Sequence, residues 1–85
     1  MTTDHERTIL REALTVLHDV GLPHVEWMLY AALAPRVVPR PALSDLQEAL
    51  QVAEKNQWVI GITGKLGEKK WAITDAGEAV RREFK

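Results

Sequence analysis

Three lysines surround a glycine-bounded turn near the end of the chain, and they are the first candidates for contact with an anionic partner. The segment WVIGITGKLGEKKWAIT places them between two apolar runs, as Lys65, Lys69 and Lys70. Lysines at the outer end of a hairpin can contact phosphate groups. Lysine also protects exposed strands from pairing with other chains. The sequence leaves both interpretations open.

Two arginines lie in a proline-rich segment just before an amphipathic stretch. They are Arg36 and Arg40 of PRVVPRP, which predicts a stiff extended loop over residues 35–41. A stiff loop that presents two arginines at a helix N-terminus could clamp a phosphate. Alternatively, the arginines form ion pairs with acidic residues of that helix, for instance Asp45.

The amphipathic stretch itself carries side chains of the kind that read bases. Gln47 and Gln51 are one turn apart on its outward face, which also carries Ser44 and Lys55. Glutamine can form two hydrogen bonds with adenine in the major groove of DNA. Outward glutamines are also ordinary on a helix surface, and Gln47 could instead complete a capping box with Ser44.

The other reactive residue types form no catalytic or metal-binding pattern. His5, His18 and His24 lack metal-ligand spacing, and the chain has no cysteine. No serine or threonine has an evident base and orienting acid. The glycines of GKLG lack the longer phosphate-loop pattern and do not lead into a helix. We therefore expect no enzyme, no cofactor and no bound metal.

The bulk composition is that of one small globular domain over residues 1–85. Lys plus Arg is 11 and Asp plus Glu is 12, so the net charge of −1 neither favours nor excludes an acidic partner. The absence of cysteine fits a reducing cytoplasm, and the polar start MTTDHERT predicts no signal peptide. No apolar run approaches the ~20 residues that span a membrane.

Apolar spacing predicts an α+β fold with the order helix, helix, helix, hairpin, helix. The first three helices are expected over residues 4–20, 24–34 and 44–56. Two strands with period-2 alternation follow, and Thr74 or Asp75 caps a last helix.

A two-stranded hairpin is barely stable in water, so this one must pack on the helices. We expect it to do so through Trp58, Ile60, Trp71 or Ile73. The second helix is apolar nearly all round, which is typical of a helix covered on more than one side.

Most of the chain resembles a winged helix-turn-helix domain. The resemblance lies in a third helix that runs into WVIGI, a basic glycine-bounded turn, a return strand and then ITDAG, and it covers residues 9–80. The segment ITDAGEAV is similar to the strand-to-helix junction of MarR- and PadR-type regulators. The resemblance implies double-stranded DNA as partner and a role in transcription regulation. The third helix would enter the major groove, and the wing, residues 63–70, would rest on the backbone. It also makes a homodimer plausible.

Two features depart from that family. The link between the second and third helices is long and proline-rich, and the third helix carries Asp45, Glu48 and Glu54 against Lys55. Carboxylates on the reading helix oppose binding, because nucleic-acid affinity depends on neutralising phosphates. The alternative is a winged helix that binds a partner protein or a second copy and no nucleic acid. Its interface would use the acidic third helix together with Trp27 and Tyr30 of the second helix, since aromatic anchors are enriched at protein interfaces.

Overall fold

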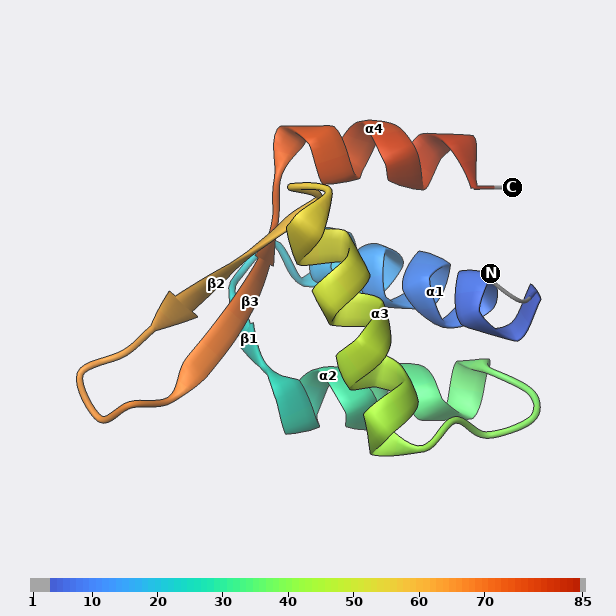
Figure 1. Ribbon diagram of the computed structural model, residues 1–85, viewed down its shortest axis with the longest axis horizontal. Helices are drawn as coiled ribbons and strands as arrows, with labels where there is room; N and C mark the ends of the chain where they lie inside the picture. Colours follow the sequence, from blue (N-terminus) through green and yellow to red (C-terminus); the bar gives the residue numbers. More distant parts are fainter. Residues whose placement is uncertain (1–3, 85) are drawn as a thin grey trace.

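The computed structural model describes residues 4–84, and these form an α+β fold, as the sequence predicts (Figure 1). The elements are α1 (Asp4–Val20), β1 (His24–Val25), α2 (Glu26–Leu33), a 3-10 turn η1 (Ala34–Arg36), α3 (Leu43–Lys55), β2 (Val59–Thr63), β3 (Lys69–Ile73) and α4 (Asp75–Glu83). The strands make one antiparallel sheet in the order β1-β3-β2. No helix in residues 4–84 is long and apolar enough to cross a membrane.

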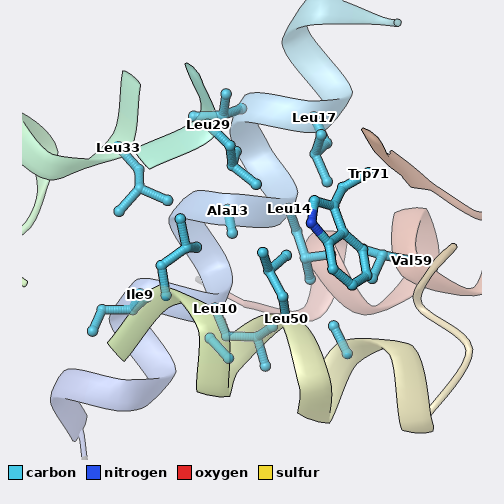
Figure 2. Packing of buried hydrophobic residues seen from close by; sticks show 14 of the residues in the cluster. Ile9, Leu10, Ala13, Leu14, Leu17, Leu29, Leu33, Leu50, Val59 and Trp71 are labelled. Carbon is cyan, nitrogen blue, oxygen red and sulfur yellow. The ribbon is translucent and has the colours of Figure 1, made fainter. Parts of the chain in front are cut away.

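The core lies between the helices and one face of the sheet. Ile9, Leu14, Leu29, Leu46 and Leu50 from α1, α2 and α3 are fully buried. The indole of Trp71 lies among core side chains of α1 and the neighbouring strand β2 (Figure 2). It is 5% exposed, so this one strand residue fixes which face of β3 points inward.

The predicted alternation of β2 is confirmed, and Trp58, Trp71 and Ile73 pack on the core as expected, but Ile60 does not. Directly opposite residues of paired strands share a face of the sheet, and Trp71 pairs with Gly61 while Ile73 pairs with Val59. Val59 therefore points into the core at 1% exposure, and Ile60 is 49% exposed on the outer face. The alternation alone could not assign the face, because both sets of β2 residues contain branched apolar side chains.

The second predicted helix begins two residues late, because His24 and Val25 form a strand. They pair with Trp71 and Lys70 of β3, so the sheet has three strands where the sequence predicts two. Val25 is extended at φ −68° and ψ 153° and serves as the N-cap of α2. The apolar pattern continues from residue 24 into α2 without a break, so the sequence does not indicate where the strand ends and the helix begins.

The loop before α3 also differs from its prediction. Residues 34–36 form a turn of 3-10 helix, so the extended part of the loop starts later than residue 35. The third helix begins at Leu43 after the N-cap Ala42, and Ser44 does not cap it. The carboxylate of Asp45 takes the capping role, accepting a hydrogen bond from the Ala42 amide at 2.9 Å. The S-x-x-Q capping box is therefore wrong.

The junction between β3 and α4 follows the prediction and explains the ITDAG sequence. Thr74 is the N-cap of α4, and its hydroxyl oxygen accepts a hydrogen bond from the Gly77 amide at 3.0 Å. The same hydroxyl donates to the Gln57 carbonyl at 2.6 Å, and the Thr74 amide donates to the Trp58 carbonyl at 3.0 Å. Gly77 lies directly on that Trp58 carbonyl, so a Cβ at this position would clash with backbone. The first turn of α4 is thus docked on the turn that links α3 to β2.

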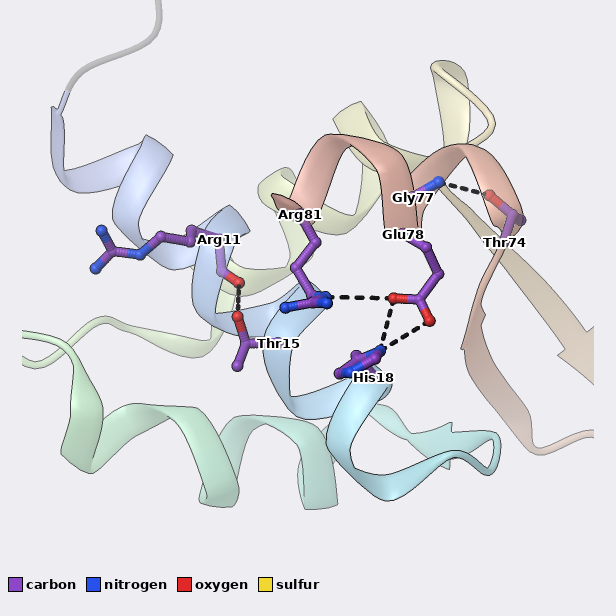
Figure 3. Close-up of polar contacts among 7 residues, drawn as sticks. All are labelled: Arg11, Thr15, His18, Thr74, Gly77, Glu78 and Arg81. Carbon is purple, nitrogen blue, oxygen red and sulfur yellow. Dashed lines mark hydrogen bonds and ion pairs between the residues drawn. The ribbon is translucent and has the colours of Figure 1, made fainter. Parts of the chain in front are cut away.

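A polar contact between His18 and Glu78 fastens α4 to α1, and Arg81 of α4 contacts the same carboxylate (Figure 3). The His18 Nδ1 lies 2.7 Å from Glu78 Oε1, and Arg81 Nε lies 3.3 Å from the same oxygen. The His18 hydrogen bond, aided by Arg81, holds the pKa of Glu78 below its ordinary value of 4.5 although partial desolvation opposes the shift. A lowered pKa means that the folded state binds the proton more weakly than the unfolded chain, so protonation of Glu78 favours unfolding.

We expect Gly77→Ala to lower the free energy of unfolding by about 2 kcal/mol, since overpacked sites typically lose 1–3 kcal/mol. Urea unfolding followed by circular dichroism measures the change. Helix propensity acts in the opposite direction, because alanine is favoured over glycine inside a helix. An unchanged or higher stability would therefore refute the close approach.

We expect the stability difference between wild type and Glu78→Gln to depend on pH. The difference should be largest above the ordinary pKa of Glu78, 4.5, and should shrink as the pH falls below that value and through the lowered pKa of the folded state. Unfolding midpoints measured across this range test the expectation. Glu83→Gln is the matched control, because it removes the same charge from the same helix away from His18. A difference for Glu78→Gln that does not vary with pH would contradict the proposed pair.

Candidate nucleic-acid interface

The outward face of α3 is polar and open. Its buried residues are Leu46, Ala49, Leu50 and Ala53. At 3.6 residues per turn, the side opposite this stripe carries the four exposed residues Ser44, Glu48, Gln51 and Lys55. Ser44, Gln51 and Lys55, which are predicted to contact DNA, therefore share one surface. The carboxylate of Glu48 lies among them.

The β2–β3 hairpin lies beside α3 and is fastened to it by one of the predicted phosphate-binding lysines. Lys69 Nζ is 3.7 Å from Glu54 Oε2 and 4.3 Å from the centre of the Trp71 ring. Lys69 shares the inner face of β3 with Trp71, because residues two apart in a strand point the same way. Gly61 makes this path available, since a Cβ there would clash with the Lys69 side chain. Lys69 thus contacts the protein and links the hairpin to the C-terminal half of α3.

The other two hairpin lysines point to solvent. Lys65 lies in the turn, and Lys70 lies on the outer face of β3, opposite Ile62 of β2. Neither forms an ion pair with any residue in the range 4–84. Glu68 adds a carboxylate to the turn, where its side chain folds against Gly64. The end of the hairpin is therefore less basic than the sequence suggests, because Lys69 is paired with Glu54 and Glu68 adds a negative charge.

The two arginines of the proline-rich loop have different surroundings. Arg36 Nη1 lies 3.7 Å from Glu12 Oε2 of α1, so its internal partner is Glu12 and not Asp45 as expected. Arg40 is exposed and has no ion pair within the described part of the chain. His5 of α1 makes a 2.9 Å hydrogen bond with the Pro39 carbonyl and ties the loop to the helix.

The two glutamines are also unequal. Gln47 lies on the flank of α3 that faces α2, and its amide donates to Glu26 Oε2 at 3.0 Å. Gln51 is exposed on the outward face. Of the pair, Gln51 has the freer amide for contact with another molecule.

The two aromatic residues proposed for an interface lie in different environments. Trp27 is 68% exposed. Tyr30 is half-buried against the core, and its hydroxyl donates to the Pro41 carbonyl at 2.7 Å, which anchors the loop before α3. Most of the available aromatic surface of α2 is therefore that of Trp27.

The sequence reasoning missed three exposed apolar residues of the hairpin. Ile60 and Ile62 lie on the outer face of β2, and Leu66 is 94% exposed in the turn. The strand register could have indicated their exposure. The short turn places Gly61, and not Ile60 or Ile62, opposite the buried Trp71.

Comparisons of the chain with protein-family models, curated proteins and solved structures found no match. Within residues 4–84, no group of three or more histidine, aspartate or glutamate side chains is arranged to hold a metal ion.

Proposed function

We propose that the protein is a winged helix-turn-helix domain that binds double-stranded DNA and acts in transcription regulation. Helices α1, α2 and α3 pack on one another, and the β2–β3 hairpin projects beside α3 (Figure 1). The observation that carries the proposal is the position of the hairpin beside α3, where the Lys69–Glu54 ion pair at 3.7 Å joins the two. A duplex that meets the outward face of α3 would therefore also meet the hairpin.

Each exposed residue has a distinct part in this proposal. Gln51, Ser44 and Lys55 face the major groove from α3, and Gln51 is the one with the side chain for reading an adenine edge. Lys65 and Lys70 contact phosphates from the hairpin, and Arg40 does so from the loop. Such contacts give affinity that decreases with salt, because each neutralised phosphate releases a condensed counterion.

The remaining members of the predicted site act indirectly. Lys69, Arg36 and Gln47 already have protein partners, which are Glu54, Glu12 and Glu26 respectively. They position the hairpin, the loop and α3, and would contact DNA only by exchanging those partners.

We expect the protein to bind a labelled random duplex at low salt, measured by fluorescence anisotropy, and the affinity to fall steeply as salt is added. In the Lys65→Ala, Lys70→Ala double variant the slope of log K against log salt should fall by about two. The matched control is Arg11→Ala, Arg82→Ala, which removes the same charge from α1 and α4. The proposal fails if no binding occurs at low salt, or if the control variant loses as much of the slope as the lysine variant.

A second candidate function, protein interaction through a homodimer, is favoured by the exposure of Trp27 at 68%. A large aromatic side chain left open on a helix is typical of the centre of an interface. A homodimer of this kind would not require the carboxylates of α3 to approach the phosphates of DNA.

For this second function we expect sedimentation velocity to show a concentration-dependent dimer. Trp27→Ser should weaken it by tenfold or more, since interface hot spots cost about 2 kcal/mol or more when truncated. Val38→Ser, at another exposed apolar position in the loop before α3, is the control. A chain that stays monomeric at all concentrations would exclude the homodimer.

A further inference from the structure

A groove of about 600 Å³ lies between α1, α3 and α4, and no part of the proposed DNA interface explains it. Its volume falls in the range of small-molecule sites, roughly 300–1,000 Å³. The apolar part of its lining consists of Leu10, Ala49, Val52, Trp58, Val80 and Phe84. Val52 is 47% exposed, so apolar surface remains open there in the folded chain.

The groove follows from how α4 is held. Its first turn is docked on the Trp58 carbonyl through Thr74 and Gly77, and the His18–Glu78 contact fastens its middle to α1. Beyond that point α4 and α3 diverge, and α1 passes behind α3 (Figure 1). Trp58 at the closed end and Phe84 at the C-terminal end of α4 line the space that is left between the helices.

The rim of the groove carries an excess of negative charge. Among residues 4–84, its ionisable lining residues are the acids Glu6, Asp45, Glu48 and Glu83 and the base Arg7. Asp45 also accepts the capping hydrogen bond from Ala42, which fixes its carboxylate beside the opening. Anions are therefore disfavoured at this opening, and a cation is attracted to it.

The groove already contains one contact of the type that an organic cation would make. The guanidinium of Arg7 lies over the Phe84 ring, 5.9 Å from its centre, within the distance of a cation–π interaction. This contact of the exposed Arg7 shows that the Phe84 ring accepts a cation at the rim of the groove.

We propose that this groove binds a small organic cation with an apolar body, of the quaternary ammonium or phosphonium class. The apolar lining takes the body, and the rings of Trp58 and Phe84 with the rim carboxylates take the charge. A hydrated metal ion does not match this lining, because hard cations require several oxygen ligands close together. The groove adjoins the outward face of α3 at Glu48, but the proposal does not require the domain to bind DNA.

Tetraphenylphosphonium is the probe for this site, and tetraphenylborate is its control, with nearly the same shape and the opposite charge. Isothermal titration calorimetry gives the affinities, and amide and indole chemical shifts of ¹⁵N-labelled protein locate the binding. We expect the cation to bind about tenfold or more tightly than the anion, and its affinity to decrease with salt. The largest shifts should fall on Val52, on the Trp58 indole and on Phe84.

Three variants test the roles of the rim charges. Glu48→Gln should weaken binding of the phosphonium by about threefold, and Arg7→Gln should strengthen it by a similar factor, as expected for partly exposed charges. Asp19→Asn on the exposed end of α1 should leave the affinity unchanged. If Arg7 had only a structural role, its replacement would not increase the affinity for the phosphonium.

The proposal is overturned if the phosphonium does not bind. It is also overturned if the borate binds equally well, or if the shifts fall on the outer face of β2 instead of the groove. Because the assay contains no nucleic acid, its result does not depend on whether the domain binds DNA.

Discussion

The close approach of α4 to the carbonyl of Trp58 is the contact on which the arrangement of the second half of the chain depends. It requires a residue without a side chain at position 77, and Thr74 adds hydrogen bonds to Gln57 and Trp58 on the other side of the same turn. Three segments are thereby fixed together: the end of α3, the start of β2 and the start of α4. The position of the hairpin beside α3 and the groove under α4 both follow from this one junction.

The three carboxylates of α3 have three different surroundings, and this changes what its acidity means. Glu54 is paired with Lys69 of the hairpin, and Asp45 caps the helix through the Ala42 amide. Glu48 is the member of the three on the outward face, at the edge of the groove. An anionic partner at that face would thus meet one uncompensated carboxylate, where the sequence suggests three. Two of the three carboxylates thus have a partner within the protein.

Much of the fold could be predicted from the sequence because the signals were local. The apolar period of α1 and the threonine that caps α4 depend only on residues close together in the chain. The short strand β1 could not be predicted in this way, since His24 and Val25 are extended only by pairing with a strand much later in the chain. The inward face of β2 was likewise decided by Trp71 across the sheet.

In the candidate site, too, the features set by nearby residues could be predicted and those set by distant contacts could not. Residue types and spacing correctly placed Ser44, Gln51 and Lys55 on one exposed face of α3. The partners of the other charged and polar side chains could not be read from the sequence, because Arg36–Glu12 and Gln47–Glu26 join different helices. Whether a polar side chain is free for another molecule is a property of the packed structure.

The pairing of β1 with β3 has a consequence for the order of folding events. The hairpin joins neighbours in the chain, whereas β1 must find a strand that follows α2, α3 and β2. Closing such a long loop costs chain entropy that only the assembled helices can offset, and contacts between distant segments slow folding. We therefore expect β1 to join the sheet late. Its two residues then complete the sheet by pairing a segment before α2 with a strand that follows α3.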